Sequence, residues 1–137
     1  MPSGLIFQAI GGRRSDPCVE SSGALSIASG PGPVMDYLAA IPDLQVSDRT
    51  STSVSGLPAE QATVVAPGTA GCENLWVWAE SPAAEPLPRG TPLRVIALDV
   101  GGEHIVLTVF GEAANPAWGP MADELIGSIR FQASEGG

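Results

Sequence analysis

The two cysteines of the chain, Cys18 in SDPCVE and Cys72 in TAGCENLWVW, are the first candidates for chemistry. A structural zinc site needs about four thiolate, imidazole or carboxylate ligands, usually in close pairs such as CxxC. Here the cysteines lie far apart and the chain holds one histidine, which disfavours zinc. The sequence favours a disulfide between two turn-rich loops, and therefore an oxidising compartment. The alternative is a pair of free, buried cysteines in a cytosolic protein.

His104 is the only imidazole that could serve a cysteine as a base. It follows a Gly-Gly turn, and the expected hairpin register places it opposite Asp99. We expect this pair to make a cross-strand charge contact worth at most about 1 kcal/mol. A small hydrolase or isomerase centred on Asp99 and His104 is the catalytic alternative.

Two tryptophans follow the second cysteine in the alternating segment ENLWVWAE, at residues 73–80. Alternation puts Trp76 and Trp78 on one face of a strand, where their rings could stack on a sugar or another flat ligand. Packing beneath a loop or helix is the competing explanation. The chain has no GxSxG motif, no phosphate-loop lysine and no paired carboxylates, so we expect neither a metal nor another cofactor.

The charge balance disfavours several classes of partner. The chain has 137 residues, a net charge of −9 and only six basic residues, all arginine. Such acidity disfavours binding to nucleic acid or to anionic lipid. No apolar run approaches the roughly 18–20 residues of a membrane span, so no direct membrane insertion is expected. The length suits one domain over residues 1–137, with an ordered core at about 4–132.

The hydrophobic pattern predicts the elements that position these residues. The helix predicted in PVMDYLAAIPDL has Val34, Leu38 and Ile41 on one face and is expected to end before Pro42. The connection over 11–32 is too rich in turn residues for a regular element. Strands are predicted over 4–10, 45–54, 60–66 and 73–80.

The strongest local signal is TPLRVIALDV-GG-EHIVLTVF, in which two apolar strands flank a Gly-Gly pair. This pattern predicts a two-residue β-hairpin. Both of its faces are apolar, so it belongs in the middle of a sheet covered by helices on one or both sides. One face is expected to carry Ile96, Leu98, Val100, Ile105, Leu107 and Val109, and the other Val95, Ala97, Val106 and Phe110.

A second helix is predicted in NPAWGPMADELIGSIRF, with Met121, Leu125 and Trp118 forming the stripe that faces the sheet. Asp123 and Glu124 are expected on its solvent side, and SIRF could form a closing strand. The predicted fold class is therefore α+β, a largely antiparallel sheet flanked by two helices.

The order of DPC, GCENLWVW, GTPLRVIALDVGGEHIVL and ADELIGSIRF resembles that of uncharacterised secreted or lipoprotein-type extracytoplasmic domains. These domains are widespread in high-GC Gram-positive and Chloroflexi-like bacteria, and their fold relatives are PsbP-like α/β/α sandwiches. The resemblance implies a bacterial cell-surface or secreted location and pairing of Cys18 with Cys72. It also implies a helix–strand junction at Ser128, with Ile129 and Phe131 at buried strand positions.

The resembling domains have another strand before the position of Gly4. This chain is therefore expected to be a fragment, or to have an open sheet edge that a second copy completes as a homodimer. The leading functional prediction is a non-enzymatic extracytoplasmic domain that interacts with an unknown protein or binds a small ligand. A carbohydrate-type binder using Trp76 and Trp78 is the alternative, beside the hydrolase or isomerase at Asp99 and His104.

Overall fold

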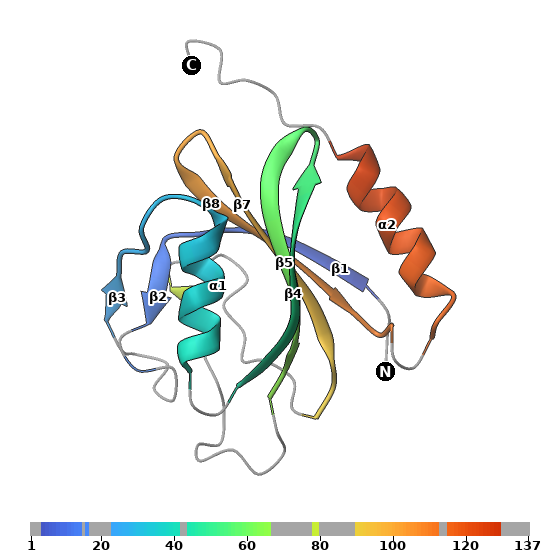
Figure 1. Ribbon diagram of the computed structural model, residues 1–137, viewed down its shortest axis with the longest axis horizontal. Coiled ribbons are helices and arrows are strands. Elements are labelled where there is room, and N and C mark those ends of the chain that lie inside the picture. Colours follow the sequence, from blue (N-terminus) through green and yellow to red (C-terminus); the bar gives the residue numbers. More distant parts are fainter. Residues whose placement is uncertain are drawn as a thin grey trace.

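One antiparallel sheet with a helix on each face forms the body of the protein (Figure 1), so the predicted α+β class is confirmed. The computed structural model describes residues 4–14, 16, 23–41, 44–66, 78–79, 90–112 and 115–129. The sheet has five strands in the order β1-β8-β7-β5-β4. Its strands are β1 (Gly4–Ile10), β4 (Gln45–Val54), β5 (Leu57–Val65), β7 (Leu93–Val100) and β8 (Glu103–Phe110), and the helices are α1 (Pro31–Ala40) and α2 (Trp118–Ser128).

The β7–β8 hairpin lies in the interior of this sheet, between β1 and β5. Gly101 and Gly102 form its turn with φ of 60° and 88°, a left-handed conformation that glycine adopts without strain. The register pairs Leu98 with Ile105 and Asp99 with His104. Both faces of the hairpin are buried, one in each of two hydrophobic clusters. The predicted register, faces and central position are all confirmed.

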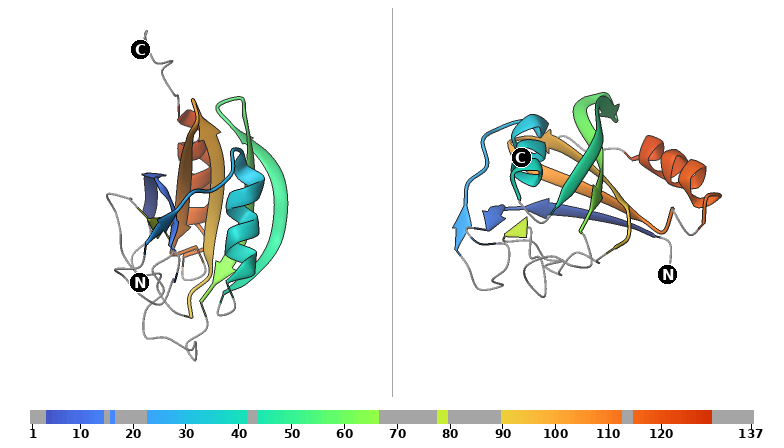
Figure 2. Two further views of the ribbon diagram at one scale, coloured as in Figure 1. Left: turned by 90° about the vertical axis from the view of Figure 1, so that its left-hand side faces the viewer. Right: turned by 60° about the horizontal axis from the view of Figure 1, so that its bottom comes forward.

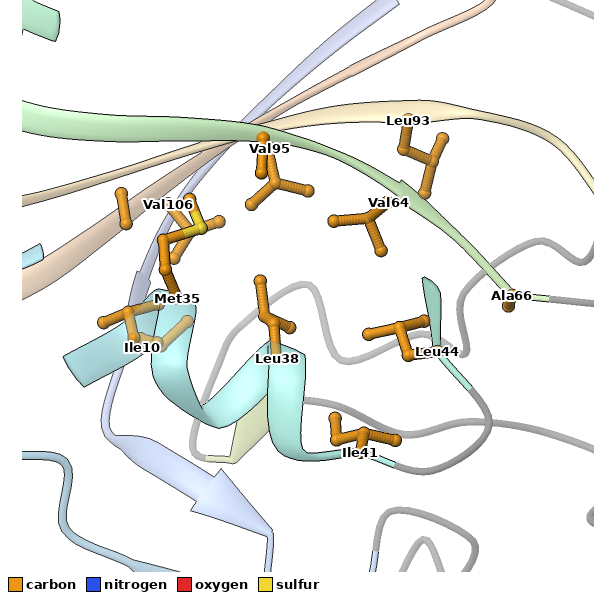
Figure 3. Packing of buried hydrophobic residues seen from close by; sticks show 13 residues of the cluster. Ile10, Met35, Leu38, Ile41, Leu44, Val64, Ala66, Leu93, Val95 and Val106 are labelled. Carbon is orange, nitrogen blue, oxygen red and sulfur yellow. The ribbon is translucent and has the colours of Figure 1, made fainter. Parts of the chain in front are cut away.

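Helix α1 covers one face of the sheet through Val34, Met35 and Leu38, which are almost fully buried. Figure 3 shows Met35 and Leu38 directed from the helix toward the strands. These side chains meet Val64, Val95 and Val106 from three strands. The helix begins at Pro31, two residues before the predicted Pro33, and Ile41 ends it with extended backbone angles. An extended residue at this position is expected because Pro42 follows.

Helix α2 covers the opposite face (Figure 2), but with a different side from the one predicted. Met121 and Leu125 are 57% and 47% exposed, whereas Ala122 and Ile126 are buried. The buried face also includes Gly119, and Trp118 packs against the cluster as predicted. Gly119 and Ala122 occupy little space on this face, and Trp118 and Ile126 supply its larger side chains.

The end of α2 matches part of the prediction for SIRF. Ser128 is the last residue of the helix, and Ile129 is extended, half-buried and packed against the α2-side cluster. The closing strand itself, including Phe131, lies outside the described residues.

A second sheet has three strands in the order β3-β2-β6, and its central strand follows β1 in the chain. Its strands are β2 (Gly12–Arg14), β3 (Ala24–Leu25) and β6 (Trp78–Ala79). The prediction of no regular element in 11–32 is therefore wrong at β2 and β3. Two- and three-residue strands are too short to give a periodic hydrophobic pattern. β6 falls within the predicted strand 73–80.

The β4–β5 hairpin forms one side of the sheet, with β4 as its outer strand. Its turn is at Ser55 and Gly56, both with positive φ, so β5 starts earlier than predicted. The pairing shifts between Ser47 and Thr50, where Asp48 has a φ of 54°. This β-bulge turns the outer strand locally.

Candidate binding site between α2 and the sheet

The cysteine and tryptophan predictions involve four residues, of which the structure describes only the backbone of Trp78. Cys18, Cys72 and Trp76 lie outside the described residues. Trp78 belongs to β6, where its backbone pairs with that of Arg13. The disulfide and the tryptophan platform therefore stay predictions.

Asp99 and His104 are register partners, but each bonds to the backbone of another segment. The Asp99 carboxylate accepts hydrogen bonds from the Gly30 N–H at 3.1 Å and the Gly102 N–H at 3.0 Å. His104 is 8% exposed, and its Nε2 lies 3.1 Å from the Ile27 carbonyl oxygen. The prediction of a charge contact between Asp99 and His104 is therefore wrong. Both side chains bind backbone groups of other residues instead.

These contacts give Asp99 and His104 a structural role. They attach the loop before α1 to the end of the β7–β8 hairpin, and Asp99 also lies at the positively polarised start of the helix. The hydrolase or isomerase centred on this pair stays a prediction.

A charged cluster on the α2 side of the sheet was not foreseen. Arg94 of β7 binds the Glu112 carboxylate at both oxygens, with Nε–Oε1 at 3.2 Å and Nη2–Oε2 at 3.1 Å. Its Nη1 lies 2.5 Å from Oδ1 of Asp123 on α2. Burial alone would lower the pKa of Arg94, but the hydrogen bonds to Asp123 and Glu112 raise it above its usual value. The guanidinium therefore stays charged throughout the neutral range.

Gly119 explains how Glu112 reaches this cluster. A Cβ at position 119 would lie only 2.9 Å from Oε2 of Glu112. The absence of a side chain on this turn of α2 leaves room for the carboxylate that holds Arg94.

A hollow of about 210 Å³ lies beside this cluster, between α2 and strands β4, β5 and β7. We call it the Arg94 hollow. Its polar lining comes from hydroxyl, amide, guanidinium and carboxylate groups, and its apolar lining from branched side chains of the core. The lining residues are Thr52, Ser53, Val54, Gln61, Arg94, Ile96, Asp123, Ile126 and Gly127.

A second hollow, of about 360 Å³, shares Arg94 and is bounded by Thr63, Pro92, Leu93 and Glu112. Arg94 thus stands between two open spaces, with only 19% of its side chain exposed. The Arg94, Glu112 and Asp123 charges sum to −1. A fixed, nearly balanced set of charges suits an uncharged polar ligand better than an anion.

The sequence contained one signal for this site. In the predicted hairpin, alternation puts Arg94 on the same face as Ile96 and Leu98, which are core residues. A charged side chain at such a position requires an oppositely charged partner. The partners themselves could not be identified, because Glu112 and Asp123 lie on a loop and on a helix whose orientation was mispredicted.

No model of a known protein family matches the sequence, and a comparison with curated proteins finds no similar chain. Within the described residues, no three side chains of His, Cys, Asp or Glu gather in a way that could hold a metal ion. No helix in the described part of the chain has the length and apolar character to cross a membrane.

Proposed function

We propose that this chain is a non-enzymatic, extracytoplasmic ligand-binding domain whose binding site is the Arg94 hollow. The observation that carries the proposal is the oriented guanidinium of Arg94, held at three nitrogens by two carboxylates beside an open polar space. A side chain fixed in this way offers its remaining N–H groups in a defined direction, so little ordering accompanies binding.

The lining favours a small, uncharged molecule with several hydroxyl groups. Gln61 and Thr52 can each donate and accept hydrogen bonds, and Asp123 adds acceptor oxygens. Ile96 and Ile126 supply an apolar wall. A volume of about 210 Å³ lies below the roughly 300–1,000 Å³ of sites for drug-sized ligands, so the ligand would be about as large as one sugar ring.

The lining residues also support binding over catalysis. Among the described residues around the hollow, Thr52 and Ser53 are hydroxyls without an imidazole or thiol beside them. A hydroxyl nucleophile needs an adjacent general base. His104, the only histidine, belongs to the α1 side of the sheet and is bonded to Ile27.

The remaining parts of the proposal are the PsbP-like fold and the extracytoplasmic location. A central antiparallel sheet with one helix on each face fits an α/β/α sandwich. The location rests on the predicted disulfide between Cys18 and Cys72.

A titration followed by ¹⁵N NMR tests the binding proposal. Glycerol, glucose and N-acetylglucosamine are added at millimolar concentrations while the Gln61 side-chain amide and the backbone amides of Arg94 and Gly127 are observed. At least one compound is expected to shift these signals saturably. Gln61→Ala and Thr52→Val should weaken its binding roughly 3- to 10-fold, the effect of one lost hydrogen bond.

Ser51→Ala is the matched control, since Ser51 lies on β4 with its side chain directed to the opposite face of the sheet from Thr52. If Gln61→Ala still binds the compound with unchanged affinity, and the compound shifts the indole N–H signals of the tryptophans, the site would be assigned to Trp76 and Trp78 instead. No saturable shift with any of the three compounds would contradict the proposal.

A further inference from the structure

Two large apolar side chains lie exposed on α2, although the fold has a core available for them. Met121 and Leu125 are 57% and 47% exposed and stand one helical turn apart. Side chains at i and i+4 are neighbours on a helix surface. They therefore form one exposed apolar strip that spans about one turn of α2.

The direction of this strip follows from helix geometry. Successive side chains turn by about 100° around an α-helix, so Met121 and Leu125 lie on the side away from Asp123. Asp123 meets Arg94 and borders the hollow over β4, β5 and β7. The strip therefore faces away from the Arg94 hollow.

Phe7 of β1 is a third exposed apolar side chain on the α2 side of the sheet. It pairs with Leu107, so it stands on the α2 side of the sheet between Leu5 and Ala9. Its side chain is 47% exposed. We call Phe7, Met121 and Leu125 the α2 flank.

We propose that the α2 flank docks a basic, amphipathic segment of another protein. Exposed apolar residues gathered on one side of a domain are characteristic of interaction sites. Glu124 adjoins the strip, is exposed and forms no ion pair with another described residue. The chain has 15 acidic residues against six arginines. A basic segment would gain charge complementarity here, whereas a second copy would bring like charges together.

Binding of three labelled 18-residue peptides tests this proposal by fluorescence anisotropy. One is an amphipathic helix of leucine and lysine, the second replaces lysine with glutamate, and the third replaces leucine with serine. We expect the Leu/Lys peptide to bind at least tenfold more tightly than either of the others. The double variant Met121→Ser with Leu125→Ser should reduce its affinity at least tenfold.

Leu25→Ser is the control for the loss of apolar surface, because Leu25 is also exposed but belongs to β3 of the other sheet. It should leave the affinity unchanged. The proposal would be overturned if the double variant bound the Leu/Lys peptide as tightly as the original chain does. It would also be overturned if the Lys/Ser peptide bound as tightly as the Leu/Lys peptide. A dimer in sedimentation equilibrium that the double variant dissociates would also overturn it, since a second copy would then occupy the flank.

Discussion

Asp99 joins the β7–β8 hairpin to the loop that precedes α1. One carboxylate accepts hydrogen bonds from Gly30, 69 positions earlier, and from Gly102 in the turn. The register between Asp99 and His104 was predictable because a Gly-Gly turn fixes it. Their true partners were not, since the loop at 26–30 has no pattern that reveals where it returns to the sheet.

Replacing Asp99 with alanine should lower the free energy of unfolding by about 1–3 kcal/mol, because two backbone N–H groups lose their acceptor. Urea denaturation followed by circular dichroism measures this change. Glu103→Ala is the control, as Glu103 is exposed in the same hairpin. Equal stability of Asp99→Ala and Glu103→Ala would show that water replaces the carboxylate without cost.

Each helix is bound to the sheet through an arginine of one strand. That arginine contacts one carboxylate on the helix and a second carboxylate outside it. Arg94 of β7 holds Asp123 of α2 together with Glu112. On the other face, Arg49 of β4 holds Asp36 of α1, with Nη1–Oδ1 at 2.8 Å, and Glu60 of β5, with Nε–Oε1 at 2.7 Å. Hydrogen bonds to Glu60 and Asp36 raise the pKa of Arg49 above its usual value.

We expect the two arginines to act on separate helices. Arg94→Met should destabilise the protein by about 1–2 kcal/mol, since it leaves the partly buried Glu112 carboxylate and the exposed Asp123 carboxylate without their cation. Amide hydrogen exchange should quicken in α2 and stay unchanged in α1. Arg49→Met, with a more exposed side chain, should quicken exchange in α1 alone. Faster exchange in both helices for either variant would contradict this separation.

The orientation of α2 shows where hydrophobicity alone misleads. The stripes Trp118–Met121–Leu125 and Trp118–Ala122–Ile126 both have helical spacing, and the first is more apolar at its middle position. The observed choice depends on two facts from elsewhere in the chain. Glu112 needs the space beside Gly119, and Arg94 needs Asp123 on the side toward β7.

This orientation predicts opposite effects at adjacent positions. Ala122→Leu should cost about 1–3 kcal/mol through overpacking at a fully buried site. Met121→Ser and Leu125→Ser should each change the stability by no more than about 0.5 kcal/mol. Thermal unfolding measures all three variants. A large loss of stability for Met121→Ser, with none for Ala122→Leu, would instead show that Met121 and Leu125 face the core as predicted from the sequence.

For the whole molecule, one sheet serves two separate cores. Residues 95, 97 and 106 join the α1-side cluster, and residues 96, 98 and 107 join the α2-side cluster. This arrangement followed from the sequence because the hairpin is apolar at both alternations. The small second sheet could not be predicted from the sequence, because its pairing joins three short segments that are distant in the chain.

The predicted disulfide acts on the stability of the whole chain. Thiol titration under denaturing conditions should find no free thiol before reduction and two after it. Reduction should lower the free energy of unfolding by about 4 kcal/mol, the entropy of closing a loop of this length. Two free thiols without reductant would remove the argument for export.

The bulge in β4 bears on how the protein behaves at high concentration. An exposed outer strand can template growth of a sheet from chain to chain, ending in aggregation. At Asp48 the register of β4 breaks, and Arg49 is turned toward the two carboxylates on the α1 side. An approaching strand could not continue an unbroken ladder past this point. Only the uncharged stretch from Thr50 to Val54 then remains for pairing with a strand of another molecule, and it is half the length of β4.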